Sequence, residues 1–244
     1  LEGIKVDFYT QKTKFRRKKV LIADMDSTIV TSETIDELAT LAGRGIEIAS
    51  ITKRSMKGEL NFDETIHERV AMLAGLEVTS FDNILAKIKL SPGAETLVRT
   101  MATDKAFTML VSGGFENFSG PVAKLVGFDQ HKANRFEIEN GRLTGRVLEP
   151  VLGPNAKLKT LLALSTKCGV AISETLAIGD GANDVPMIKA AGLGIAYYGK
   201  PITRDAALLN TNAEASGTCI DHADLTAALF FQGFRRKEFT KRRL

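Results

Sequence analysis

Four short apolar runs, each followed by turn-forming or acidic residues, place the strongest constraint on the fold of this chain. The runs are Val20–Ala23, Phe107–Val111, Leu176–Ile178 and Leu193–Ala196. The longer stretches between them have helical periodicity, as in Asn155–Cys168. Strands that alternate with helices predict an α/β fold built on a doubly wound parallel sheet of the Rossmann type. Such a sheet binds its ligands at the carboxyl ends of its strands.

Residues 31–90 interrupt this alternation and predict a helical cap inserted directly after the first strand. Apolar residues share one helical face from Ile35 to Ala42, and no strong strand pattern follows. Asn61, with Glu64 three residues later, has the spacing of a capping box at the start of a helix. After the cap, the sequence predicts a helix over Ser91–Ala102, with Ser91 as its N-cap.

The dipeptide Asn140-Gly141 lies in the middle of the alternating segment Arg135–Val147 and predicts a small β-hairpin flap. The resulting division is a catalytic core of residues 19–30 and 91–233, with the cap at 31–90. Residues 1–18 form a basic N-terminal lead, a possible remnant of a longer N-terminal region, and residues 234–244 form a basic tail.

The charge distribution argues against a nucleic-acid partner. The chain carries +4 in total, but residues 1–19 and 235–244 carry +5 each, which leaves −6 for the body between them. An acidic body is unfavourable for binding the phosphate backbone of a nucleic acid. The sequence therefore predicts two solvated, mobile tails on an acidic body, and no nucleic-acid partner. It carries no signal for the oligomeric state.

The two cysteines, Cys168 and Cys219, have no metal-binding or redox spacing. This usage is typical of a reducing compartment and predicts a cytoplasmic protein. No apolar run reaches the roughly 18 residues of a membrane-spanning helix, so no membrane partner is expected.

Carboxylates follow two of the predicted strands. Asp24 and Asp26 come directly after the first apolar run, and Asp180 and Asp184 lie in Gly179–Asp184 after the third. Carboxylates that converge at one sheet edge repel each other unless a cation lies between them. Hard oxygen ligands in a site that must also accept phosphate favour Mg²⁺.

Two further segments predict a phosphate site at the same edge. Ser112-Gly113 ends the second strand and offers a hydroxyl and open backbone N–H groups, a typical anion cradle. Lys157 lies near the start of the helix after Pro154 and offers a positive charge. Each signal is ordinary alone, whereas their combination with the carboxylates indicates phosphoryl chemistry.

With these residues in place, the chain resembles the phosphoserine phosphatases of the haloacid dehalogenase superfamily. The four superfamily motifs correspond to Asp24–Thr28, Ser112-Gly113, Lys157 and Gly179–Asp184. The narrower pattern of the cap corresponds to the segments Thr31–Glu37, Met56–Phe62 and Glu68–Val70.

The resemblance implies a phosphoric monoester hydrolase that releases serine and phosphate in the last step of serine biosynthesis. It implies that Asp24 is the nucleophile and Asp26 the general acid and base. Mg²⁺ would be held by the Asp24 carboxylate, the Asp26 backbone carbonyl and Asp180. Asn183 would orient the bound phosphate or substrate, and Asp184 would support the metal and the lysine.

For the substrate, the resemblance implies that Glu33 binds the ammonium group and Arg69 the carboxylate of phosphoserine, with Ser112, Gly113 and Lys157 on the phosphate. Other readings remain open at this point. The same catalyst is compatible with another small phosphorylated metabolite, or with phosphotransfer to an alcohol. A binding module without catalysis is disfavoured, because it has no need of the nucleophile Asp24.

Overall fold

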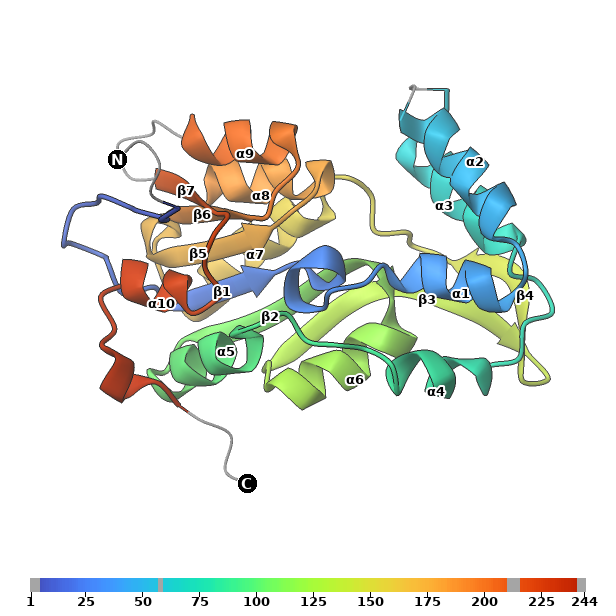
Figure 1. The fold of residues 1–244 in the computed structure, drawn as a ribbon, viewed down its shortest axis with the longest axis horizontal. Coiled ribbons are helices and arrows are strands. Elements are labelled where there is room, and N and C mark those ends of the chain that lie inside the picture. Colours follow the sequence, from blue (N-terminus) through green and yellow to red (C-terminus); the bar gives the residue numbers. More distant parts are fainter. Residues whose placement is uncertain (1–4, 57–58, 210–215, 241–244) are drawn as a thin grey trace.

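Seven strands form one sheet in the order β4-β3-β2-β1-β5-β6-β7 in the computed structural model, which describes residues 5–56, 59–209 and 216–240. The strands are parallel except for β4, which runs antiparallel to β3 (Figure 1). The strand bounds are β1 Val20–Ala23, β2 Phe107–Phe115, β3 Gln130–Glu139, β4 Arg142–Leu148, β5 Thr175–Gly179, β6 Leu193–Tyr197 and β7 Ser216–Ile220. The mostly parallel α/β sheet that the sequence predicts is confirmed.

Helices cover both faces of the sheet. Their bounds are α1 Thr34–Leu41, α2 Gly45–Met56, α3 Phe62–Ala71, α4 Ser80–Leu85, α5 Ala94–Thr103, α6 Glu116–Val126, α7 Ala156–Cys168, α8 Val185–Ala190, α9 Pro201–Leu208 and α10 Ala227–Phe231. Strand β1 shows why two layers form, because all four of its side chains are fully buried. Val20 and Ile22 belong to the apolar cluster with α7, α8 and α9. Leu21 and Ala23 belong to the cluster with α5, α6 and α10.

In the described residues between β1 and α5, helices α1 to α4 follow one another without an intervening strand, as the sequence predicts. Helices α2 and α3 lie side by side and project away from the sheet (Figure 1). Asn61 caps α3 through the expected reciprocal bonds with Glu64. Helix α4 packs against the core, where Phe81 lies 5.2 Å from Phe118 between ring centroids. The division into core and cap at residues 31 and 90 stays a prediction.

The predicted hairpin is confirmed, whereas the predicted start of the helix after the cap is wrong. The hairpin forms at Asn140-Gly141, where both residues have positive φ. However, the first part of β3 pairs with β2, so the hairpin extends the main sheet. Helix α5 begins at Ala94 after Gly93, and Ser91 is not its N-cap. The reason is tertiary: Gly93 has φ of 81° and lies against the backbone of Thr226.

The described parts of both ends have mostly exposed side chains, as solvated tails would, but they also contact the rest of the fold. Arg17 lies over the Phe234 ring at 3.6 Å from its centroid and pairs with Glu238 at 2.7 Å. The Asp7 carboxylate accepts hydrogen bonds from the backbone N–H groups of residues 221–223. Residues 1–4 and 241–244 lie outside the described part of the chain. No helix in the described part has the length and apolarity required for a transmembrane span.

Candidate active site

Asp24 follows β1 at the edge where the parallel strands end. Its backbone N–H donates to the Ile178 carbonyl at 3.0 Å, which continues the pairing with β5. The chain then turns tightly through Met25–Ile29, where Ser27 has φ of 55°. The Asp24 side chain is buried, and its Oδ1 accepts a hydrogen bond from the Met25 N–H at 2.8 Å. The strand end and the turn together fix this carboxylate in the interior of the site.

Asp26 connects the strand ends to the cap. Its Oδ1 accepts a hydrogen bond from the backbone N–H of Thr34, the first residue of α1, at 2.8 Å. Its Oδ2 accepts one from the Ser112 hydroxyl at 3.2 Å. Burial raises the pKa of Asp26 to about 6, although both hydrogen bonds oppose the shift. A carboxyl group with a pKa near neutrality is suited to exchange protons with a substrate.

Lys157 joins the two motifs that carry aspartates. Its Nζ lies 2.6 Å from Asp24 Oδ1 and 2.5 Å from Asp184 Oδ1, and all three side chains are buried. Burial lowers the pKa of Lys157, but the charges of Asp184 and Asp24 outweigh this effect. The pKa of Lys157 is therefore raised above its usual value, and the amine stays charged. Burial and the charge of Asp184 raise the pKa of Asp24 well above its usual value, against the opposing effect of Lys157.

Asp180 and Asp184 follow β5, and the glycine before them allows their close packing. Asp184 Oδ2 accepts hydrogen bonds from the backbone N–H groups of Asp180 and Gly181 at 3.1 and 3.0 Å. A Cβ atom at Gly179 would lie 2.3 Å from Asp184 Cγ, so only glycine fits there. Lys200 Nζ lies 3.4 Å from Asp180 Oδ2.

The donor set of this cluster fits a hard divalent cation. Asp24, Asp180 and Asp184 each offer a carboxylate oxygen, and these atoms lie within 4.8 Å of one another. Counting Asp26, four carboxylates outnumber the two amines of the site, so the cluster has a negative excess that a cation would balance. The Asp26 carboxylate is not part of this oxygen cluster. This is compatible with the expectation that Asp26 binds the cation through its backbone carbonyl.

Ser112 and Gly113 lie near the end of β2, as predicted. Ser112 Oγ accepts a hydrogen bond from the Gly114 N–H at 2.8 Å. The Gly113 carbonyl accepts one from Asn134 Nδ2 at 2.8 Å, and Asn134 Oδ1 accepts one from the Leu152 N–H at 2.7 Å. Buried Asn134 therefore connects Gly113, near the end of β2, to Leu152 in the segment before α7. The sequence analysis missed Asn134, for which a polar residue inside a strand-forming segment is the only signal.

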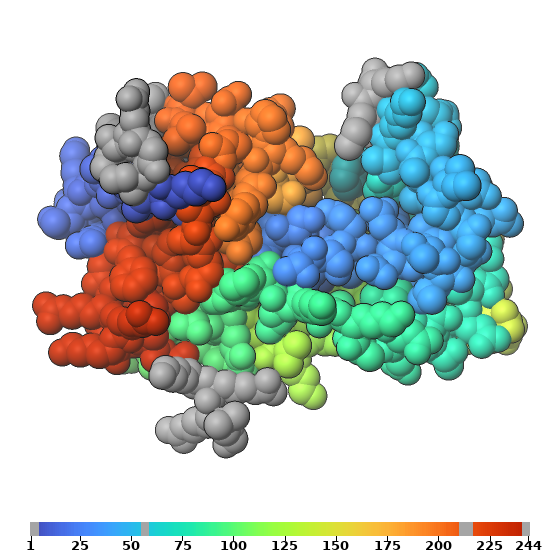
Figure 2. Space-filling model, in the orientation of Figure 1, coloured from blue at the N-terminus to red at the C-terminus, as the bar shows by residue number. Residues whose placement is uncertain are grey.

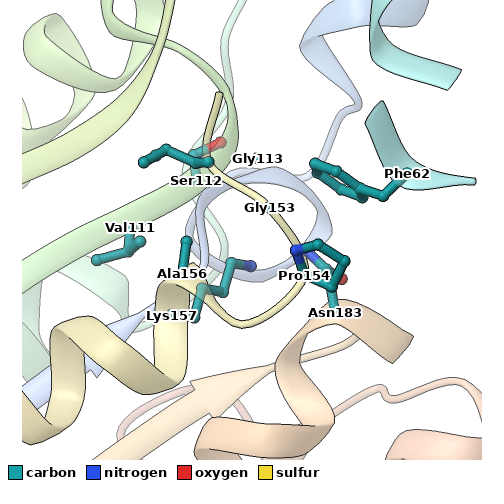
Figure 3. A pocket seen from close by; sticks show the side chains of 10 residues that line it. Phe62, Val111, Ser112, Gly113, Gly153, Pro154, Ala156, Lys157 and Asn183 are labelled. Atoms are coloured by element: carbon teal, nitrogen blue, oxygen red, sulfur yellow. The ribbon is translucent and has the colours of Figure 1, made fainter. Parts of the chain in front are cut away.

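A narrow pocket lies between Ser112-Gly113, near the end of β2, and the start of α7. Figure 3 shows Lys157 and Asn183 at this pocket from the core and Phe62 from the start of α3. Asn183 Nδ2 lies 3.9 Å from the position of a Cβ on Gly113, so the predicted phosphate residues and Asn183 are brought together. The side chain of Met56 and residues 57–58 lie outside the described part of the chain.

A larger cleft of about 410 Å³ lies beside this pocket, between the strand ends and the cap. The volume is within the range of small-molecule sites. Figure 2 shows the surface hollowed between the α8–α9 region and the projecting pair α2–α3. The cleft is lined from the core by Asp24, Asp26, Gly113, Gly114, Asp180, Asn183 and Lys200, and from the cap by Glu33, Thr34, Thr52, Phe62, Thr65 and Arg69.

Glu33 and Arg69 bring opposite charges to the cap side of this cleft. Glu33 Oε1 accepts a hydrogen bond from the Ser27 hydroxyl at 2.7 Å. Arg69 is half-buried, and its Nη2 donates to Thr52 Oγ1. Its Nε is buried without a hydrogen-bond partner, and among the described residues no carboxylate forms an ion pair with it. Burial lowers the pKa of Arg69, and the charges of Asp36 and Glu33 oppose this.

Two more residues of the cleft were missed by the sequence analysis. Lys200 follows β6, so the rule that located the aspartates at strand ends also applied to it. Thr52 lies inside α2, and nothing in the local sequence distinguishes it from a solvent-facing helical threonine. Its role depends on a tertiary contact with α3.

Comparison with known proteins gives a consistent family. The model of the haloacid dehalogenase-like hydrolases matches residues 21–189. A phosphoserine phosphatase of Streptococcus thermophilus is 44% identical over 77% of this chain and 87% of its own length. One of Streptomyces coelicolor is 39% identical over 91% of this chain and 52% of its own length. This chain thus spans about half to three fifths of the length of several curated relatives.

Solved structures agree with the sequence relatives. A phospho-aspartyl intermediate analogue of a phosphoserine phosphatase superimposes with a TM-score of 0.78 at 36% identity. The match covers 88% of this chain and 99% of that one. The likeness therefore extends beyond the sheet and includes at least part of residues 31–90.

Proposed function

Because the chain belongs to the haloacid dehalogenase-like hydrolases, we propose that it hydrolyses O-phosphoserine through a phosphorylated Asp24. The observation that carries this proposal is the lining of the cleft. Asp24 and Asp26 of the core face the same space as Glu33 and Arg69 of the cap. Phosphoserine has a phosphate, an ammonium group and a carboxylate, and the cleft offers a counterpart for each.

In the first step, an Asp24 oxygen attacks phosphorus, and the bond between phosphorus and the serine oxygen breaks. The contacts of Asp24 with Met25 and Lys157 both fall on Oδ1, which supports Oδ2 as the attacking atom. The serine alkoxide is a poor leaving group, so Asp26 donates its proton to that oxygen as it departs. A pKa of about 6 supports this role. The products are serine and an aspartyl phosphate.

In the second step, water attacks phosphorus of the aspartyl phosphate. Asp26, now ionised, takes a proton from this water, and the bond between phosphorus and Asp24 breaks. Phosphate leaves, and both carboxyl groups return to their starting states. Two displacements of moderate difficulty replace one difficult displacement.

Ser112, Gly113 and Lys157 bind the phosphate oxygens in this proposal, and Asn183 orients them. The buried Lys157 amine is held by Asp24 and Asp184 and has a third hydrogen for a phosphate oxygen, so it needs little reorganisation when charge develops. The Ser112 hydroxyl donates its one hydrogen to Asp26 and must turn it to the phosphate when substrate binds. Asp24 and Asp180, with the Asp26 backbone carbonyl, would hold Mg²⁺, and Asp184 would support this set. When bound, Mg²⁺ offsets the negative charge of phosphate and nucleophile.

Arg69 makes the substrate assignment testable. Its half-buried guanidinium lacks an ion-pair partner among the described residues, which supports a role in binding the carboxylate of the substrate. Glu33 binds the ammonium group in this proposal, which its position in the lining of the cleft supports. A charged hydrogen bond contributes about 1.5–3 kcal/mol. Arg69→Ala is therefore expected to lower kcat/KM for phosphoserine roughly ten- to a hundredfold.

The measurement compares phosphoserine with an aryl phosphate, which has no carboxylate and is expected to lose little. The control is Arg54→Ala, because Arg54 lies on α2 and pairs with Glu68 at 2.7 Å outside the cleft lining. Glu33→Gln should likewise weaken phosphoserine hydrolysis more than hydrolysis of 3-phosphohydroxypropionate. An equal loss for all substrates in Arg69→Ala would refute the assignment to phosphoserine and leave the role of Asp24 standing.

A further inference from the structure

Thr52 lies on α2 and contacts Arg69 on the neighbouring helix α3. The Thr52 hydroxyl donates to the carbonyl of Ile48 in its own helix at 3.0 Å. A hydroxyl has one hydrogen, so this bond leaves only lone pairs of Oγ1 for other partners. Arg69 Nη2 donates to that oxygen. The direction of both bonds is therefore determined, and Thr52 acts toward Arg69 only as an acceptor.

This contact is the one hydrogen bond that the described residues provide to the Arg69 side chain. An arginine side chain has many rotamers, and its binding of a planar carboxylate depends on the orientation of the guanidinium plane. Asp36 and Glu33 act on Arg69 through their charge, without an ion pair in the described part of the chain. Thr52 is thus the one described residue that contacts the guanidinium of Arg69 through a hydrogen bond.

We propose that Thr52 is a positioning residue, which holds the Arg69 guanidinium toward the cleft and so contributes to selection of substrates that carry a carboxylate. This inference rests on the proposed function, because it assigns to Arg69 the carboxylate of phosphoserine. Thr52 itself lines the cleft beside Arg69. The ordering of Arg69 before substrate arrives reduces the entropy lost on binding.

The test compares Thr52→Val with Thr52→Ser. Valine has nearly the shape of threonine but no acceptor, whereas serine keeps the acceptor. Thr52→Val is expected to raise KM for phosphoserine about three- to tenfold with little change in kcat. Hydrolysis of an aryl phosphate should change less than twofold, and Thr52→Ser should restore most of the loss.

Thr40→Val is the matched control for the loss of a helical hydroxyl. Thr40 Oγ1 donates to the Asp36 carbonyl at 2.9 Å, the same bond within a helix, but Thr40 is exposed on α1 and does not line the cleft. This variant should behave as wild type toward both substrates. If Thr52→Val unfolds at a much lower temperature than Thr40→Val, Thr52→Ala replaces it in the same comparison.

A double-mutant cycle separates this inference from the proposed function. In the Arg69→Ala background, Thr52→Val is expected to have no further effect on phosphoserine hydrolysis. A full effect in that background, an equal loss for the aryl phosphate, or no rescue by Thr52→Ser would overturn the positioning role. If Arg69→Ala lowers hydrolysis of phosphoserine and of the aryl phosphate equally, the assignment of phosphoserine as substrate is refuted, and the positioning role of Thr52 with it. If it is selective and Thr52→Val has no effect, only this inference fails.

Discussion

Lys157 contacts two carboxylates at once, and this arrangement sets the charge state of the candidate active site. Its amine lies 2.6 Å from Asp24 and 2.5 Å from Asp184. One cation cannot balance a cluster of buried carboxylates, so the site as a whole retains a negative excess. Burial, followed by the charge of Asp184, raises the pKa of Asp24. The negative excess favours the binding of a divalent cation, which in turn favours the ionised nucleophile.

At this scale the proposed mechanism predicts that Asp24→Asn abolishes turnover and preserves the fold. The amide has nearly the same shape as the carboxylate but is a poor nucleophile. Phosphate release should fall at least about a thousandfold, or about 4 kcal/mol of transition-state stabilisation. EDTA should abolish phosphate release by the wild-type protein, and added Mg²⁺ should restore this activity. Asp82→Asn, at an exposed position on α4, is the control, and undiminished hydrolysis in Asp24→Asn would refute the mechanism.

At the scale of the elements, the sequence predicted the parts of the fold that are determined locally. Buried strands such as β1 read as continuous apolar runs, and the polar residues after them meet at one sheet edge. This rule is sufficient to assign Asp24, Ser112 and Asp180 to the same edge from the amino-acid sequence alone. The capping box at Asn61 and the turn at Asn140-Gly141 were predictable for the same reason, because their signals lie within four residues.

Elements that depend on distant contacts were not predictable in this way. Strand β7 is a short edge strand, Ser216–Ile220, with small and polar residues in place of an apolar run. Ser91 has the residue type of an N-cap, but the packing of Gly93 against Thr226 delays the start of α5. In the site, Thr52 acts through a contact between two helices, and sequence spacing carries no information about that contact.

The C-terminal segment tests whether an element far from the candidate site affects catalysis. Phe239 lies 5.1 Å from Phe230 between ring centroids, and the Thr240 N–H donates to Thr100 Oγ1 at 2.9 Å. Thr100 is near the end of α5, which precedes β2, so this contact lies at the amino ends of the strands. The candidate site lies at their carboxyl ends.

Removal of residues 239–244 is therefore expected to leave kcat/KM for phosphoserine within about threefold of wild type. The lost packing should lower the free energy of unfolding by about 1 kcal/mol. Steady-state kinetics and urea denaturation measure the two effects separately. A fall in kcat/KM of about a hundredfold, or about 2.7 kcal/mol, would show instead that the C-terminus contributes to the site.

For the whole molecule, Lys18 lies just before the amino end of β1, whereas the cleft lies at the carboxyl ends of the strands. Lys18 joins three segments that are far apart in the sequence. Its backbone N–H donates to Gln232 Oε1 at 3.0 Å, and its Nζ donates to the Ser173 carbonyl at 2.8 Å. The residue is only 6% exposed. A charge on this amine is therefore partly removed from water whenever the chain is folded.

Burial lowers the pKa of Lys18 to about 8 from the usual value of 10.5, although the charge of Glu174 opposes the shift. Between these two pH values the unfolded chain binds more protons at Lys18 than the folded chain does. The free energy of unfolding that this residue contributes must therefore rise with pH across that interval. The stability cost of the buried charge is present in full below pH 8 and disappears as the pH approaches 10.5.

The prediction is that wild type gains stability relative to Lys18→Met as the pH is raised from 7 to 9.5. After allowance for screening by solvent, the relative gain should be about 1 kcal/mol. Urea denaturation of both proteins at each pH measures it.

Loss of the hydrogen bond to Ser173 shifts the stability difference between wild type and Lys18→Met by a constant, because a neutral amine also donates. Only the change of this difference with pH therefore reports the titration of Lys18. Lys124→Met, at an exposed position on α6, should show no such change. A difference between wild type and Lys18→Met that is constant from pH 7 to 9.5 would show that Lys18 keeps its ordinary pKa in the folded protein.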